Sequence, residues 1–133
     1  MLRKYKIYKQ DLIYPDLSYE ISGVLFDVFK EIGSGHQEKH YQRAIAIALK
    51  NKGIKFQEQV PADLLYNNEK IGKYFLDFVI DDKIVLEIKK GVYFRKTNLG
   101  QVIGYLKVKN YKLGLIANFT DKGVKIYRVL NTC

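Results

Sequence analysis

The chain has 133 residues, of which 47% are hydrophobic and 28% are charged, and it contains only 2 prolines. This composition excludes a disordered or low-complexity protein, because such proteins lack the apolar residues that form a core. A chain of this length buries about two thirds of its unfolded surface, so its core needs no disulfide or structural metal. We expect a single domain over residues 1–133, with its core from about residue 12 to about residue 130.

The chain is basic: 23 lysines and arginines oppose 14 aspartates and glutamates, which gives a net charge of +9. This balance favours a polyanionic partner, because each phosphate that contacts a lysine or arginine releases condensed counterions. Charge alone does not identify the partner, since many basic proteins bind nucleic acid only nonspecifically or not at all. DNA or RNA is therefore favoured by the composition without being established by it.

The cysteine content and the N-terminal segment indicate the compartment. Cys133 is the only cysteine, which excludes an intramolecular disulfide and a cysteine-based zinc cluster and favours a reducing compartment. The N-terminal segment alternates charged and apolar residues, unlike a signal peptide, and no later stretch approaches the roughly 18 apolar residues of a membrane span. We expect a soluble, cytoplasmic protein without a membrane partner.

Two helices are predicted in the first half of the chain. Over residues 18–32, apolar residues recur at intervals of three and four, the pattern of an amphipathic helix, and Gly33 is a typical stop signal. After the short loop GSGHQ, the same spacing predicts a second helix over residues 37–52, which ends at Gly53. The two helices should form a hairpin.

Strands are predicted after the second helix, where the apolar spacing changes to two. Short strands are expected at residues 54–60 and 62–66, with Pro61 marking a kink or a sheet edge between them, and a turn is expected at residues 67–70. The remaining elements are two strands that are apolar on both faces, one helix and two closing strands, at residues 74–80, 84–89, 97–110, 113–119 and 124–129. The order ααββββαββ predicts an α/β (α+β) domain with a mixed sheet flanked by helices. The two strands that are apolar on both faces should form the centre of this sheet.

Two carboxylates interrupt these central strands, Asp77 in YFLDFVI and Glu87 in IVLEIKK. An unpartnered buried carboxylate is costly, so such residues are normally paired with a cation or bound to a metal. A three-residue loop at residues 81–83 would set Asp77 opposite Glu87, whereas a two-residue loop would send the two carboxylates to opposite faces. With either loop, Glu87 shares a face with Lys89. A structural pair of carboxylate and lysine explains these residues equally well.

A site shared by two carboxylates suits a divalent cation. Neighbouring carboxylates raise one another's pKa unless a cation lies between them, and hard oxygen ligands favour Mg²⁺ or Mn²⁺. Such a site suits phosphodiester hydrolysis, because the metal activates water and a lysine stabilises the negative charge of the transition state. We reject zinc: His36 and His40 have a compatible helical spacing, but no third ligand is within reach along the sequence.

Four separated segments resemble, in order and spacing, the GxxExxY proteins, a branch of the PD-(D/E)xK nuclease superfamily. They are GHQEKHY at residues 35–41, Asp77, EIK at residues 87–89 and QVIGY at residues 101–105. The QVP segment at residues 59–61 and the LGLIANF strand also match, so the resemblance covers nearly the whole chain. It implies one restriction-endonuclease-like domain.

The resemblance also implies roles for individual residues. Asp77 and Glu87 would bind Mg²⁺ or Mn²⁺, and Lys89 would orient the water or stabilise charge. Gln101 and Tyr105 match the QxxxY motif of the superfamily and would face the substrate or the catalytic lysine. Without the resemblance, their shared helix face would be interpreted as solvated.

Glu38 matches the helical carboxylate that completes the metal site in related nucleases. Its spacing from Tyr41 and Ile45 places it on the buried stripe of the second helix. The helix dipole alone would also favour a carboxylate in this first turn. One residue departs from the superfamily pattern, because Leu76 precedes Asp77 where the superfamily name has proline.

Four residues beside the predicted site, Lys90, Tyr93, Arg95 and Lys96, could follow a phosphate backbone and stack on unpaired bases, or form a solvated charged loop. We expect a Mg²⁺- or Mn²⁺-dependent nuclease. The alternatives are a catalytically inactive nucleic-acid-binding or assembly module on the same fold and a purely structural basic domain. A two-fold homodimer is the simplest arrangement for a nuclease of this size that cuts both strands of a duplex.

Overall fold

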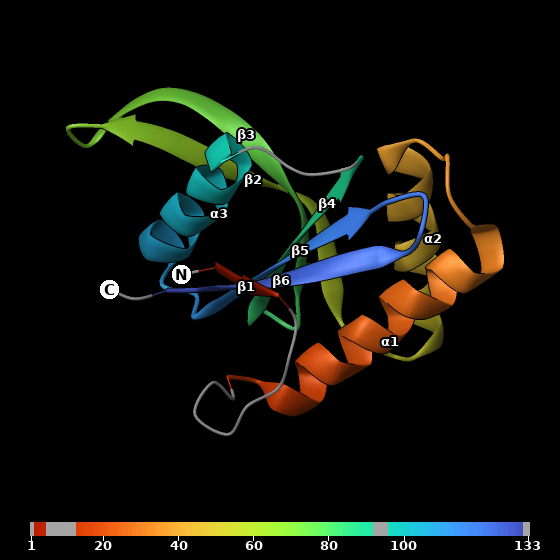
Figure 1. Cartoon of the computed structure of the whole chain (residues 1–133). Helices are drawn as coiled ribbons and strands as arrows, with labels where there is room; N and C mark the ends of the chain where they lie inside the picture. The colour runs from red at the N-terminus through yellow and green to blue at the C-terminus, as the bar shows by residue number, and fades with distance from the viewer. Residues whose placement is uncertain (1, 5–12, 92–95, 132–133) are drawn as a thin grey trace.

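The computed structural model describes residues 2–4, 13–91 and 96–131 (Figure 1). Within these ranges the elements are β1 (Leu2–Lys4), α1 (Pro15–Ile32), α2 (Glu38–Asn51), β2 (Phe56–Tyr66), β3 (Glu69–Ile80), β4 (Ile84–Lys90), α3 (Lys96–Lys109), β5 (Leu113–Phe119) and β6 (Val124–Leu130). None of these helices has both the length and the apolar character needed to cross a membrane.

The described strands form one six-stranded mixed sheet in the order β1-β6-β5-β4-β3-β2. β4 and β5 are parallel neighbours, connected through α3, and the other neighbouring pairs are antiparallel. The predicted mixed sheet flanked by helices is confirmed. Its centre is different from the prediction, because β4 lies beside β5 while β3 is only one strand from the edge.

Helices cover the two faces of the sheet, with α1 and α2 on one face and α3 on the other (Figure 1). The layer under α1 and α2 contains the buried side chains of Ile21, Leu25, Ile45, Leu49, Phe78, Ile80, Ile84, Leu86 and Ile88. The layer under α3 contains those of Leu76, Val79, Val85, Val102, Leu106 and Ile116. The two layers explain why β4 is apolar on both faces.

The helical hairpin is confirmed, and Tyr41 holds its loop in place. Gly33 ends α1 with a φ of 72°, a left-handed conformation that glycine adopts without strain. The Tyr41 hydroxyl donates a hydrogen bond of 2.7 Å to the Gly33 carbonyl, and its ring stacks on Phe119 at 4.0 Å between centroids. Tyr41 therefore ties the loop and the start of α2 to the end of β5.

β2 is one continuous strand where two short strands were predicted. Pro61 lies in its middle, opposite Phe75 of β3. β2 is the edge strand of the described sheet, so one side of its backbone faces no other strand among the described residues, and a proline without an N–H group is tolerated there. The predicted turn is shorter than expected: Asn67 and Asn68 both have positive φ, 50° and 65°, as in a two-residue hairpin turn.

The β2–β3 ribbon changes face halfway along its length. Phe56 and Phe78 face the layer of α1 and α2, whereas Ala62 and Leu76, an even number of residues away, face α3. In a regular strand, residues of the same parity lie on the same face. The ribbon is therefore strongly twisted between its two halves.

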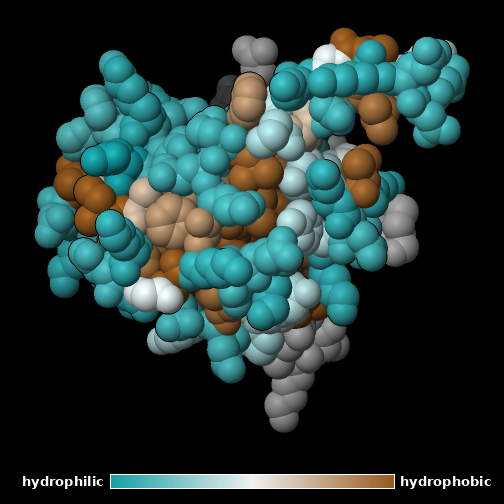
Figure 2. Space-filling model, turned by 180° about the vertical axis from the view of Figure 1, so that it is seen from behind, coloured by the Kyte–Doolittle hydropathy of each residue, from teal (hydrophilic) through white to brown (hydrophobic). Residues whose placement is uncertain are grey.

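This change of face occurs at Gln59, which has a left-handed backbone with a φ of 50°. The regular pairing of β2 with β3 is interrupted where Gln59 lies across from Asp77. We call the ribbon beyond this point, residues 60–76, the arm. The arm projects away from the body of the protein above α3 (Figures 1 and 2).

Candidate functional site

Asp77 and Glu87 lie where β3 and β4 diverge. Ile80 pairs with Ile84 across a three-residue loop, which confirms the register that sets the two carboxylates opposite each other. The regular ladder between the strands ends at the pair Phe78 and Leu86, next to Asp77 and Glu87. Beyond it, β3 turns into the arm while β4 continues beside β5 (Figure 1).

Each carboxylate accepts a hydrogen bond from the backbone of the other strand. The N–H of Asp77 donates to Oε1 of Glu87 and the N–H of Ile88 donates to Oδ2 of Asp77, both at 2.8 Å. These bonds satisfy backbone donors that the interrupted ladder leaves without a carbonyl partner. The two side chains therefore join the strands at the point where they separate, which holds both carboxylates inside the sheet.

Both carboxyl groups have a raised pKa. Burial raises the pKa of Glu87 to about 8, and the negative charge of Asp77 adds to this rise. Burial likewise raises the pKa of Asp77. The backbone hydrogen bonds and the charge of Lys89 lower both pKa values without offsetting the burial. Near neutral pH, the pair therefore favours holding a proton unless another positive charge is present.

Lys89 lies on the same face of β4 as Glu87, since Leu86 and Ile88 fill the opposite face. It is half-buried, and its charge acts on both Asp77 and Glu87. In the described part of the chain it forms no direct ion pair with either carboxylate. The structure thus brings the three residues together with the lysine beside the pair.

Glu38 begins α2 and is exposed, so its predicted place on the buried stripe is wrong. The stripe starts one turn later at Tyr41, and Glu38 lies at the free end of the helix. Its charge nevertheless raises the pKa of both Asp77 and Glu87. No group of three or more His, Cys, Asp or Glu side chains in the described ranges is placed to hold a metal, so Glu38 remains outside the pair.

Gln42 and Gln59 connect α2 to the carboxylate pair. The Gln59 side-chain amide donates to Oε1 of Gln42 at 2.9 Å and lies 3.5 Å from Oδ1 of Asp77. The Gln42 amide donates in turn to Glu58 at 3.3 Å. No sequence pattern predicts a role for Gln42, and Gln59 is visible in the sequence only as part of the QVP segment, because periodicity does not reveal a left-handed residue.

Tyr74 links the pair to α3. Its hydroxyl donates a 2.7 Å hydrogen bond to the carbonyl of Gln101, and burial raises its pKa to about 12, with smaller contributions from Glu87 and Tyr105. The Gln101 side chain is exposed, whereas Tyr105 is buried and stacks on Tyr111 at 6.0 Å. The structure therefore ties the backbone of Gln101 to Tyr74 of β3 and places Tyr105 in the core beneath α3.

The four residues expected to bind nucleic acid lie after the pair in the sequence. Tyr93 and Arg95 lie outside the described residues, and Lys96 begins α3 without a described side chain. Lys90 lines a hollow of about 370 Å³, which is formed by the α1–α2 loop and the end of β5 and is lined by neither carboxylate of the pair. Lys90 therefore belongs to a separate surface.

Asn118 is a second residue that the sequence analysis missed. It is fully buried in β5, beside Lys89 of β4. Its side-chain amide donates to the carbonyl of Gly91 at 3.3 Å, while its Oδ1 has no hydrogen-bond partner among the described residues. Asn118 thus fixes the end of β4 next to the lysine.

The donor set of this site fits a hard divalent cation. Oε2 of Glu87 accepts no hydrogen bond from the described residues, and Oδ1 of Asp77 has only the long contact with Gln59. Oxygen ligands of this kind suit Mg²⁺ or Mn²⁺. A cation would also favour the ionised form of both carboxyl groups, which burial disfavours.

Comparisons with known proteins add one family and one fold neighbour. A family model described as the PD-(D/E)XK nuclease superfamily matches residues 15–129. No curated protein matches the sequence significantly. The solved structure of a protein named SSO0001 superposes with a TM-score of 0.49 at 14% sequence identity, covering 95% of this chain and 81% of that chain.

Proposed function

Because the chain belongs to the PD-(D/E)XK nuclease superfamily, we propose that it is a metal-dependent nuclease that hydrolyses phosphodiester bonds of DNA or RNA. The observation that carries this proposal is the carboxylate pair, in which Asp77 and Glu87 lie partly buried, each with a raised pKa and each bonded to the opposite strand. A purely structural role would be served better by apolar residues, because buried carboxylates cost free energy without a compensating cation.

The residues have distinct roles in this proposal. Asp77 and Glu87 hold Mg²⁺ or Mn²⁺, which when bound lowers the pKa of water and neutralises charge on the phosphate. Lys89, on the same face, stabilises the negative charge that develops on the phosphate oxygens. Gln101 and Tyr105 support the substrate side of the site through Tyr74.

Glu38 has a supporting role in the proposal. It lies near enough to influence the pair electrostatically, and in the GxxExxY branch that the sequence resembles it belongs to the motif. We infer that its negative charge would assist cation binding and would affect metal affinity more than turnover. Glu38→Gln should therefore raise the Mg²⁺ concentration needed for half-maximal cleavage.

The proposal is tested by cleavage of end-labelled single- and double-stranded DNA and RNA with Mg²⁺, with Mn²⁺ and with EDTA. Glu87→Gln and Asp77→Asn preserve side-chain shape and should abolish metal-dependent cleavage. Glu20→Gln, an exposed carboxylate on α1, is the matched control and should cleave like the wild type. Cleavage that persists in both site variants would rule out this site.

One observation favours a second candidate, a binding or assembly module that has lost turnover. Glu38 stands outside the pair, so the described carboxylates alone do not make a three-ligand site. If no substrate is cleaved with either metal while nucleic acid is still bound, this second function is the better description. The two-fold homodimer stays a prediction, which light scattering at several protein concentrations tests.

A further inference from the structure

Exposed hydrophobic side chains gather on the arm and the helix below it. In the described ranges they are Leu64, Leu65, Tyr66, Ile71 and Phe75 of the ribbon and Val108 of α3. Tyr66 and Phe75 are 66% and 52% exposed. Figure 2 shows the arm standing out from the body with hydrophobic atoms on it and a hollow beneath. An exposed cluster of this kind typically marks a binding surface.

The hollow beneath the arm is a groove between the ribbon and α3. Its outer part, about 340 Å³, is lined by Pro61, Asp63, Leu65, Lys73, Val108 and Lys109. Its inner part, about 180 Å³, shares Asp63, Leu65 and Val108 and continues to Tyr74 and Gln101. Because the two parts share residues, they form one continuous depression, which we call the arm groove.

The inner end of the arm groove lies on the strand that carries Asp77. Tyr74 lines this end and precedes Asp77 by three residues on β3. The floor along α3 is open, because a Cβ added at Gly100 or Gly104 would meet no atom within 4 Å. A chain lying in the arm groove would therefore run along β3 towards Asp77.

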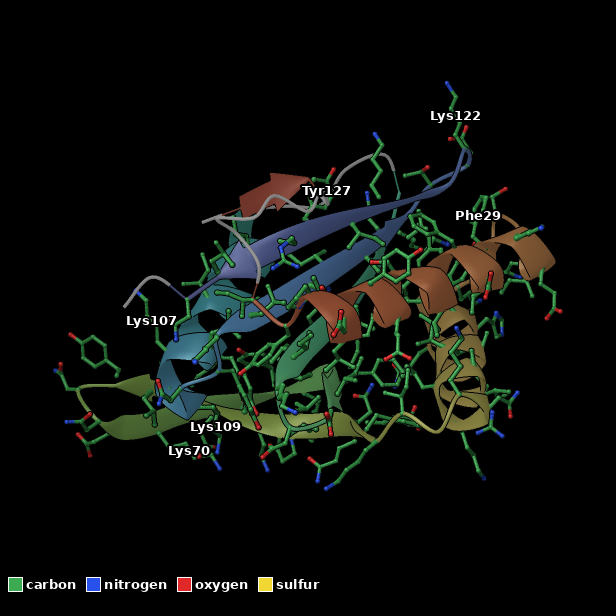
Figure 3. The ribbon with its side chains drawn as sticks, turned by 90° about the horizontal axis from the view of Figure 1, so that it is seen from below. Phe29, Lys70, Lys107, Lys109, Lys122 and Tyr127 are labelled. Atoms are coloured by element: carbon green, nitrogen blue, oxygen red, sulfur yellow. The ribbon has the colours of Figure 1, made fainter. Side chains whose placement is uncertain are left out.

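The outer end of the arm groove is basic. Lys73 of β3 and Lys109 of α3 both line it, and Lys70 and Lys107 lie at the same end of the molecule (Figure 3). The acidic residue in the groove, Asp63, is neutralised by Lys70 at 3.4 Å. The ammonium of Lys73 lies 5.8 Å from the ring centroid of the exposed Phe75, so a cation and an aromatic face are presented together.

We propose that the arm groove binds a single strand of DNA or RNA and guides it to the carboxylate pair, an inference that rests on the proposed nuclease function. Lysines bind phosphates, and exposed aromatic side chains, here Tyr66 and Phe75, stack on unpaired bases. A duplex hides its base faces inside the helix, so it would contact the lysines and leave the hydrophobic cluster uncovered. The combination therefore favours a single strand.

Binding is tested by fluorescence anisotropy in EDTA, using a labelled single strand of about 12 nucleotides as DNA and as RNA, and the matching duplexes. The double variant Lys73→Ala/Lys109→Ala should bind the single strand at least tenfold more weakly. Its slope of log affinity against log salt should fall by about 0.7 for each phosphate that the variant no longer binds. Phe75→Ala should weaken single-strand binding roughly tenfold and change duplex binding little.

Lys122→Ala/Lys125→Ala is the matched control, because it removes the same charge from exposed positions and Lys122 lies at the opposite end of the molecule (Figure 3). Equal reductions of affinity in the two double variants would mean diffuse electrostatic binding and would overturn the inference. So would an unaffected Phe75→Ala, tighter binding of the duplex, or no binding by the wild type. Melting curves check that every variant is folded.

Since this experiment measures no cleavage, its outcome is separate from that of the nuclease assay. Binding through the arm groove without cleavage would support the arm groove as a binding site and contradict the proposed nuclease function. Cleavage by the wild type, together with normal binding by the arm variants, would support the nuclease function and contradict the role of the arm groove.

Discussion

The base and the arm of the β2–β3 ribbon belong to the same two strands but have opposite environments. At the base, Phe78 and Ile80 are completely buried, and β3 has a partner strand on each side. In the arm, β3 pairs with β2 alone within the described residues, and Phe75 is half exposed. The base is part of the core, whereas the arm is held mainly by its own hairpin and by contacts with α3.

The carboxylate pair lies at the junction of these two regions. In a regular ladder, the backbone N–H groups of β3 and β4 would donate to carbonyl groups of the opposite strand. None would then be available to donate to the carboxylates. The regular pairing of β3 with β4 ends at Phe78 and Leu86, and beyond it Asp77 and Glu87 each accept a hydrogen bond from the backbone of the opposite strand. Gln59, with its left-handed backbone, interrupts the pairing of β2 with β3 at the same level. The difference between base and arm coincides with irregular pairing, which occurs at Gln59 and again between Leu64 and Leu65.

The largest expected contrast between junction and arm is in turnover. Lys89→Met removes the charge beside the pair and should lower kcat about 10²- to 10³-fold, the reduction typical of removing one group that stabilises transition-state charge. Phe75→Ala should instead raise KM more than it lowers kcat, because it acts on binding. Steady-state cleavage of a single strand with Mg²⁺ measures both constants. A kcat reduction in Phe75→Ala as large as in Lys89→Met would erase the distinction.

The second contrast is in the pH dependence of stability without metal. The folded state raises the pKa of Glu87 from 4.5 to about 8, so it binds more protons than the unfolded state between these values. The free energy of unfolding should therefore be highest below pH 4.5 and fall, by up to a few kcal/mol, as the pH rises towards 8.

Urea unfolding in EDTA at several pH values measures this second effect. Glu87→Gln should flatten the curve, because it removes the titrating group. Glu69→Gln, an exposed carboxylate of the arm, should leave the wild-type slope in place. A slope of the opposite sign would contradict the burial of the pair.

The third contrast concerns metal and thermal stability. In EDTA above pH 8, Glu87→Gln should melt a few degrees above the wild type, because it removes the repulsion within the ionised pair and keeps an oxygen that accepts from the N–H of Asp77. Mg²⁺ at about 100 times its Kd should stabilise the wild type by about 2.7 kcal/mol and the variant far less. Melting curves in EDTA and in Mg²⁺ decide this, and equal shifts in both proteins would exclude a metal site at the pair.

The smallest expected effect is at the twist itself. Gln59→Gly should relieve a left-handed backbone and stabilise the metal-free protein by about 1 kcal/mol. Asn67→Gly, at the tip of the arm with the same φ of 50°, should gain less, because asparagine tolerates this conformation better than glutamine. Chemical denaturation measures both changes. Destabilisation by Gln59→Gly would show that the side-chain contacts of Gln59 outweigh the backbone strain.

Sequence reasoning predicted the features that depend on regular periodicity. The apolar runs around Asp77 and Glu87 predicted two neighbouring strands, and Lys89 followed from alternation within one of them. The sequence left two registers open because it does not determine the length of the loop at residues 81–83. The structure decides between them through the pairing of Ile80 with Ile84.

The features that could not be predicted are those that depend on irregular backbone conformation or on where a helix or strand ends. No pattern marks the left-handed φ of Gln59, so the change of face and the continuous β2 were missed. Glu38 fits the helical spacing of a buried residue, yet spacing does not reveal where the helix extends beyond the sheet. The contacts of Asn118 depend on the end of β4, which is distant in the sequence.

The pairing of β1 with β6 has a consequence for the order of folding. It joins Leu2 to Val129, residues separated by nearly the whole chain. Closing so long a loop costs conformational entropy. The three residue pairs offset this cost only when the rest of the sheet has already formed and brought the two strands close together. The edge formed by β1 should thus be added after the rate-limiting step of folding. Contacts between β1 and β6 that stabilise the folded state would therefore slow unfolding without accelerating folding.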